Sequence, residues 1–213
     1  MTGPVAGGLQ AWGALVLGPM QGGARSRLWR VDVAGRLCVA RRVAVGEPSL
    51  RWLQRLQAVA VAQGVRLAPL MPAQTGALTV GGWTVEPWLD GRPGTAADLA
   101  AVRSTLRRMH RAARAWPPRP GLVPRLPLRV KVATPEVAAV HGDVHPGNVL
   151  RLAGGGLAMI DWEEARLGDT RLDLGFARDA AGRAAHAAAE VAACWWAEPD
   201  RARMMARIVR TLR

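Results

Sequence analysis

Apolar residues recur along the chain at two spacings. Residues 28–33 and 37–40 resemble two strands joined by a turn at Gly35, and this pattern predicts a β-hairpin. Residues 50–60 and 99–109 instead place apolar side chains three or four positions apart, which is the spacing of one face of an α-helix. The chain is therefore predicted to combine short strands with amphipathic helices.

More elements are predicted further along the chain. Residues 149–152 and 157–160 are apolar runs joined by consecutive glycines, a typical hairpin signal. Residues 78–80 and 83–88 are predicted to form another strand pair. Residues 173–213 are predicted to form two helices with one apolar face each.

The composition limits the class of protein. A chain of 213 residues forms one large domain or two small lobes, and half of its residues are apolar. It contains no uninterrupted apolar run of about 18 residues, and its start lacks a signal-peptide pattern. We therefore expect a cytoplasmic protein that makes no use of a membrane. Cys38 and Cys194 lack metal-ligand spacing and are expected to be buried reduced thiols.

The net charge of +13 comes almost entirely from arginine, because Lys131 is the only lysine. So basic a chain could bind nucleic acid through phosphate contacts. The arginines are, however, scattered along the chain, and no basic run is interleaved with aromatic residues. Attraction of a polyanionic nucleotide is the more economical use of the charge, so nucleic acid is not expected as the main ligand.

The candidate chemistry lies at residues 141–148, which read His-Gly-Asp-Val-His-Pro-Gly-Asn, and at Asp161. The hairpin that follows Asn148 returns Asp161 to its neighbourhood, so three oxygen-bearing side chains converge. Mg2+ prefers carboxylate and amide oxygens and takes further ligands from phosphates, which suits Asn148 and Asp161. Asp143 is then expected to take the proton of an attacking hydroxyl. Its spacing to Asn148 matches that of the kinase catalytic loop.

The same stretch allows another interpretation. His141, Asp143 and His145 alternate in sequence, so on a strand they would face one side and could bind a transition metal. This alternative leaves Asn148 and Asp161 without a role.

Residues 141–148, together with Ile160-Asp161-Trp162, resemble the signature of the aminoglycoside phosphotransferase and choline kinase superfamily. These kinase-like enzymes phosphorylate small molecules. The resemblance implies an α+β, two-lobed, protein-kinase-like fold. Residues 1–88 would form a nucleotide-binding lobe of antiparallel sheet plus helix, and residues 89–213 a mainly helical catalytic and acceptor lobe. ATP or GTP would bind with Mg2+ between the lobes and donate its terminal phosphoryl group to a small-molecule hydroxyl.

The resemblance also implies a nucleotide site. Gly22 and Gly23 correspond to the loop that covers the nucleotide, although they could also form an ordinary turn. Glu86 and Trp88 lie in the stretch that resembles the hinge beside the base. Arg41 stands where a lysine is common, and an arginine fork does not replace a point charge without a change of geometry. The alternative function is therefore a catalytically weak or inactive nucleotide-binding module.

The resemblance also suggests roles for other acidic residues. Glu47 is expected either to pair with Arg41 or to be solvated. Glu163 and Glu164 are expected to be available to an acceptor. Asp173 is expected to be structural.

The chain has little material for an acceptor pocket. Residues 116–127 are rich in proline and are predicted to be irregular. The resemblance implies that most of the extra helices which many relatives carry in the C-terminal lobe are absent here, so the acceptor site is expected to be shallow, open or completed by a second subunit in a homodimer.

Overall fold

The computed structural model describes residues 4–20, 28–125, 136–174, 187–188, 191 and 199–211. The chain divides into two compact units, and each unit combines two stretches. The first is Met1–Gln57 with Ala68–Asp90, and the second is Ala58–Leu67 with Gly91–Arg213. The division of the chain into functional lobes at residue 88 stays a prediction.

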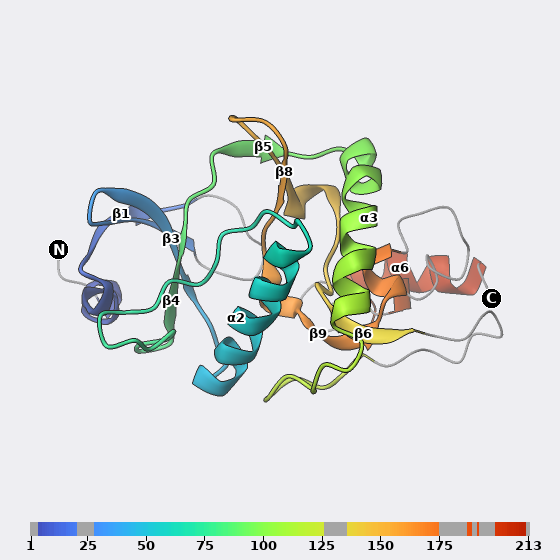
Figure 1. Cartoon of the computed structure of the whole chain (residues 1–213), viewed down its shortest axis with the longest axis horizontal. Coiled ribbons are helices and arrows are strands. Elements are labelled where there is room, and N and C mark those ends of the chain that lie inside the picture. Colours follow the sequence, from blue (N-terminus) through green and yellow to red (C-terminus); the bar gives the residue numbers. More distant parts are fainter. Residues whose placement is uncertain are drawn as a thin grey trace. The chain divides into compact units, whose positions relative to one another are not determined.

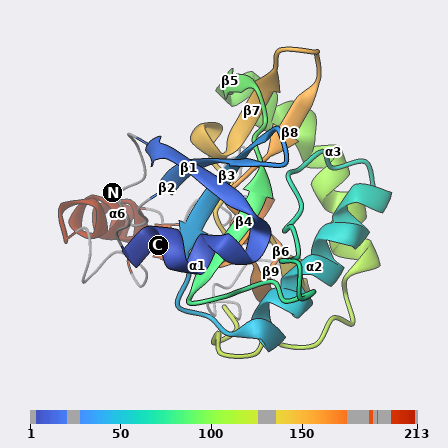
Figure 2. The same cartoon turned by 90° about the vertical axis from the view of Figure 1, so that its left-hand side faces the viewer.

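The first unit is built on an antiparallel sheet in the order β1-β2-β3-β4 (Figures 1 and 2). The strands are β1 (Ala14–Pro19), β2 (Leu28–Val33), β3 (Arg36–Arg42) and β4 (Trp83–Pro87). Ala34 and Gly35 join β2 to β3 with positive φ angles of 53° and 79°, the conformation that a tight hairpin turn requires. The hairpin predicted around Gly35 is confirmed.

One face of this sheet forms the core of the first unit. Helix α1 (Pro4–Leu9) and the short 3-10 helix η1 (Gln10–Trp12) supply Leu9 and Trp12, which join buried residues of β2, β3 and β4. The indole nitrogen of Trp12 donates a hydrogen bond of 2.9 Å to the carbonyl oxygen of Met71. Cys38 is a free thiol in this core, where burial raises its pKa. Cys194 lies outside the described residues.

Helix α2 (Glu47–Ala62) buries the predicted apolar face, and its first residue has an unexpected role. The Glu47 carboxylate accepts hydrogen bonds from the backbone N–H groups of Leu78 and Thr79 and pairs with Arg51 at 2.7 Å. The expectation of a solvated Glu47 is therefore wrong, and its described ion-pair partner is Arg51, whereas that of Arg41 is Glu86. The strand predicted at residues 78–80 is also wrong, because side-chain oxygens occupy two of its donors and only Val80 pairs, with Trp83.

The second unit contains helix α3 (Ala96–Ala112), which contacts residues 137–140, 146–148 and 171–174. The helix buries Leu99, Leu106 and Met109, as its spacing predicted. At its start, Asp98 accepts hydrogen bonds from the backbone N–H and the hydroxyl of Thr95, at 2.7 and 2.8 Å. The same carboxylate oxygen lies 2.9 Å from Nε of Arg151 on the neighbouring hairpin. Asp98 therefore fastens the helix start to that hairpin.

The strands of the second unit are short. A sheet in the order β5-β7-β8 consists of β5 (Gly91–Pro93), β7 (Val149–Leu152) and β8 (Leu157–Met159), and β6 (Val137–Val140) pairs with β9 (Arg166–Asp169). Short helices are η2 (Pro146–Asn148), η3 (Trp162–Glu164) and α4 (Arg171–Leu174), and α6 (Pro199–Thr211) is longer. The predicted hairpin of β7 and β8 is confirmed.

The remaining predictions for this unit are tested in part. Residues 116–125 are irregular apart from the bridge of Arg125 to Gly168, as expected. Of the two helices predicted after residue 173, α6 is present, and most of the preceding stretch lies outside the described residues. Within the described part of the chain, no helix has the length and apolar character needed to span a membrane.

Asp98 makes stability depend on pH. Hydrogen bonds from Arg151 and Thr95 lower the pKa of Asp98 from 3.8 to about 2. Because the folded-state pKa lies below the unfolded one, the stabilisation is complete above about pH 4 and is lost as pH falls towards 2. We expect Asp98→Asn to lower the melting temperature at pH 6 and to differ less from the wild type at pH 2. Thermal melts of both proteins between pH 2 and pH 6 test this expectation. Asp200→Asn, which removes a charge from an exposed ion pair, is the control. A difference in melting temperature between Asp98→Asn and the wild type that does not change with pH would contradict the expectation.

Candidate active site

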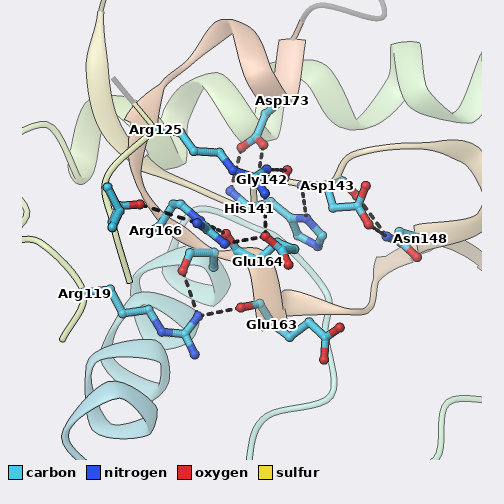
Figure 3. Close-up of polar contacts among 12 residues, drawn as sticks. Arg119, Arg125, His141, Gly142, Asp143, Asn148, Glu163, Glu164, Arg166 and Asp173 are labelled. Atoms are coloured by element: carbon cyan, nitrogen blue, oxygen red, sulfur yellow. Dashed lines mark hydrogen bonds and ion pairs between the residues drawn. The ribbon is translucent and has the colours of Figure 1, made fainter. Parts of the chain in front are cut away.

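The buried carboxylate of Asp173 fixes the start of the loop formed by residues 141–148 (Figure 3). Its two oxygens accept the backbone N–H groups of His141 and Gly142, each at 2.8 Å, and Nε2 of His110 donates to it at 2.8 Å. Burial alone would raise the pKa of Asp173, but the hydrogen bond and charge of His110, with the Gly142 N–H, hold it below its ordinary value. The predicted structural role of this residue is consistent with these contacts.

Gly142 makes the turn that follows β6. Its φ is +87°, and a Cβ at this position would lie 2.5 Å from the carbonyl oxygen of Glu164. Both the backbone conformation and the close approach require glycine. The turn therefore brings the residue before Asp143 against the segment that follows Asp161.

His141 links the loop to the end of the hairpin. Its Nδ1 accepts the backbone N–H of Asp143 at 3.3 Å, so the ring proton is on Nε2, which donates to the carbonyl oxygen of Ile160 at 2.9 Å. The ring packs against Trp162 with a centroid distance of 4.6 Å. Because both nitrogens are committed to the protein, the alternative of His141 as a transition-metal ligand is not supported.

Asp143 and Asn148 are in direct contact, as the spacing predicted. Nδ2 of Asn148 donates to the backbone oxygen of Asp143 at 2.9 Å and to its carboxylate at 3.1 Å. Asn148 is 6% exposed. Figure 3 shows its amide oxygen on the side away from Asp143. This contact orients the Asp143 carboxylate. Nε2 of His145 lies 3.7 Å from the same carboxylate.

The hairpin returns Asp161 to this loop through the backbone of Ile160. The Ile160 N–H donates to the carbonyl oxygen of Asn148 at 3.0 Å, while its C=O accepts from His141. The next residue, Asp161, has left-handed angles of φ 64° and ψ 59°. Aspartate tolerates this conformation better than most residues. The segment that carries Asp161 is thus held by both ends of the loop of residues 141–148.

Three of the predicted nucleotide residues, Arg41, Glu86 and Trp88, lie in the first unit. Arg41 and Glu86 share the sheet face opposite the core, with 3.7 Å between Nη2 and Oε1. Exposed Leu15 and Leu17 alternate with core-facing residues on β1. Trp88 is half-buried and its N–H donates to Leu37 at 3.0 Å. Gly22 and Gly23 lie outside the described residues. The placing of a nucleotide between the lobes stays a prediction.

Three arginines that the sequence analysis did not identify surround the segment after Asp161. Arg125 lies 2.7 Å from a carboxylate oxygen of Glu164, and Arg166 pairs with the same oxygen. The third, Arg119, donates to the backbone oxygens of Glu163 and Ala165. The expectation that Glu164 is available to an acceptor is therefore wrong, because two guanidinium groups hold it. The Glu163 carboxylate points away from Arg119 in Figure 3.

The fold is that of small-molecule kinases. Choline kinase LicA from Streptococcus pneumoniae superposes with a TM-score of 0.64 and 12% identity over 93% of this chain and 94% of that one. Another LicA structure, in complex with AMP, has a TM-score of 0.63, 11% identity and coverage of 94% and 93%. An aminoglycoside phosphotransferase from Alicyclobacillus acidocaldarius has a TM-score of 0.60 and 14% identity, over 100% of this chain and 78% of that one. A putative fructosamine-3-kinase from Thermobifida fusca has a TM-score of 0.60 and 16% identity, over 100% of this chain and 99% of that one.

The sequence comparison adds that residues 119–207 match the phosphotransferase enzyme family. No curated protein sequence matches the chain. The two-lobed, kinase-like α+β fold is thereby confirmed. The family match over residues 119–207 agrees with the resemblance drawn from the sequence.

Asp173 is expected to be essential for stability. Asp173→Ala removes a buried charge and leaves three donors without their acceptor, and breaking such a buried pair costs about 3–5 kcal/mol. The free energy of unfolding in urea measures this loss. Asp200→Ala at the exposed start of α6 is the control and should stay within about 0.5 kcal/mol of the wild type. A similarly small change for Asp173→Ala would contradict the anchoring role.

Proposed function

We propose that the protein is a Mg2+-dependent phosphotransferase that moves the terminal phosphoryl group of ATP or GTP to a hydroxyl of a small molecule. The observation that carries the proposal is the contact of Asp143 with Asn148, combined with the Ile160 backbone that keeps Asp161 beside the same loop. The match of residues 119–207 to the phosphotransferase enzyme family supports it.

The donor set fits Mg2+. Asn148 offers an amide oxygen and Asp161 a carboxylate, and such hard oxygen donors are the ligands that Mg2+ takes alongside water and phosphate oxygens. These two residues would hold the ion. Bound there, it would neutralise charge on the transferring phosphoryl group.

Asp143 is assigned to the acceptor hydroxyl. Its carboxylate is oriented by Asn148 and its backbone by His141, so its position is set before an acceptor arrives. It would align the attacking hydroxyl and accept its proton as the new oxygen–phosphorus bond forms and the bond to the leaving nucleotide breaks. Phosphoryl transfer needs little covalent work from the protein, so this positioning accounts for much of its contribution.

The nucleotide is assigned to the residues of the first unit. Arg41 would contact the phosphates, Gly22 and Gly23 would cover them, and Glu86 and Trp88 would lie beside the base. The acceptor is a small molecule with a hydroxyl group; an aminoglycoside, a sugar and an amino alcohol are the candidates to be screened. Because Glu164 is paired with two arginines, the chain offers a polycationic acceptor fewer carboxylates than the sequence suggested.

A second function is favoured by one observation. Arg41 pairs with Glu86, and a planar guanidinium held by a carboxylate differs in reach from the lysine common at this position. A nucleotide-binding module with little turnover would have the same fold. Nucleotide binding without transfer or hydrolysis in the wild-type chain would favour this function.

Replacing the proposed base is expected to stop transfer but not binding. Asp143→Ala should lower turnover on the order of 10²-fold or more, because the carboxylate assigned to the proton of the hydroxyl is lost. Labelled ATP and GTP, supplied with a panel of hydroxyl-bearing metabolites, measure transfer, and equilibrium titration measures nucleotide affinity. Asp200→Ala serves as the control. Turnover equal to that of the wild type would exclude Asp143 as the base.

Replacing the proposed metal ligand is expected to remove the effect of Mg2+. Asp161→Asn keeps a side chain that tolerates the left-handed backbone but removes the charge, so Mg2+ should no longer tighten nucleotide binding. Titrations with and without Mg2+ test this in the variant and the wild type. If Mg2+ strengthens binding equally in both proteins, Asp161 is not a ligand.

A further inference from the structure

We propose that Arg125 is a positioning residue that clamps the catalytic loop to the segment following Asp161. This inference rests on the proposed function for its effect on turnover. The clamp itself rests on the contacts of Arg125 with Gly142 and Glu164.

The two ends of one guanidinium reach two different segments. Nη1 of Arg125 donates to the carbonyl oxygen of Gly142 at 3.2 Å, and Nη2 lies 2.7 Å from Oε2 of Glu164. Gly142 immediately precedes Asp143, and Glu164 follows Asp161 by three residues. Figure 3 shows Arg125 beside both. A single side chain thus bridges the segment of the proposed base and the segment of the proposed metal ligand.

The backbone of Arg125 is fixed independently of its side chain. Its N–H donates to the carbonyl oxygen of Leu167 at 3.0 Å, and its C=O accepts from the N–H of Asp169 at 3.0 Å. Arg125 therefore lies along β9 as an isolated bridge partner of Gly168. A guanidinium on a fixed backbone loses less conformational entropy when it forms its hydrogen bonds. The backbone contacts therefore favour a bridge with one defined geometry.

The bridge between Arg125 and Glu164 is partly shielded from solvent. The side chains of Arg125 and Glu164 are 18% and 24% exposed, so water screens their attraction only in part. Arg119 supports the same segment, because it donates to the backbone oxygens of Glu163 and Ala165. Burial and the charge of nearby Arg166 lower the pKa of Arg119 to about 10. Arg166 also pairs with Glu164. The segment after Asp161 is therefore held by side chains from outside the hairpin that delivers it.

The fork of arginine is needed for this geometry. A lysine ammonium is a compact point charge on a flexible stem and cannot span a carbonyl oxygen and a carboxylate in one fixed plane. Loss of the bridge should let the two segments move apart by fractions of an ångström. Such displacements affect phosphoryl transfer more than ground-state binding, because transfer depends on alignment.

The experiment compares Arg125→Gln and Arg125→Lys with Arg114→Gln. Arg114 lies in the same unit and pairs with Glu136, but both side chains are more than half exposed, at 57% and 60%. We expect both Arg125 variants to fold, turnover to fall about 10-fold or more, and the KM for nucleotide to change less than about threefold. Lysine should restore only part of the loss. Arg114→Gln should behave as the wild type.

A double-mutant cycle assigns the effect to the bridge. Arg125→Gln and Glu164→Gln should each lower turnover, and the double variant should lose less than the product of the two fold-losses, because both single variants remove the contact of Arg125 with Glu164. Each single variant also removes a second contact, that of Arg125 with Gly142 or that of Glu164 with Arg166, so the expected result is coupling and not equality. Additive losses, full activity of Arg125→Lys, or turnover within twofold of the wild type in Arg125→Gln would overturn the proposal.

A readout that needs no activity separates this proposal from the proposed function. Amide hydrogen exchange of residues 141–143 and 161–166 should accelerate in Arg125→Gln and stay unchanged in Arg114→Gln. Faster exchange in a chain whose wild type shows no transfer would support the clamp and contradict the phosphotransferase. Unchanged exchange in Arg125→Gln would overturn the clamp whatever the activity. If Arg125→Gln fails to fold, Arg125→Lys carries the same comparison.

Discussion

The buried carboxylate of Asp173 is the constraint on which the loop of residues 141–148 depends. It gathers three hydrogen-bond donors from two elements, the end of α3 and the loop after β6. An uncompensated carboxylate in such a place would be very costly, whereas one that accepts several N–H groups is stable in its charged form. The direction in which the chain leaves β6 is therefore determined by electrostatics as well as by packing.

From this fixed start, the remaining geometry follows by backbone contacts. His141 and Asn148 each hold one end of the Ile160 peptide, so the hairpin returns to the loop that it left. Gly142 permits the close approach of the segment around Glu164. Few of these contacts depend on the identity of surface side chains, which is consistent with a shared fold at sequence identities of only 11–16%.

The parts predictable from sequence were those encoded by short-range patterns. The β7–β8 hairpin follows from apolar runs around glycines, and the contact of Asp143 with Asn148 follows from their spacing in one loop. The partners of Glu164 could not be predicted, because Arg125 is far away in sequence and is one of many scattered arginines. Glu47 was misjudged for a similar reason: its backbone partners at residues 78 and 79 lie in a loop with no distinguishing residue type.

The arginine at position 41 has a chemical consequence beyond nucleotide affinity. A guanidinium stays protonated at all ordinary pH values and has no nucleophilic lone pair, whereas a lysine amine can be acylated. Reactive nucleotide analogues that label kinases through a phosphate-binding amine would have no target at this position. Arg41 would therefore contribute nothing to amine acylation of the proposed nucleotide site.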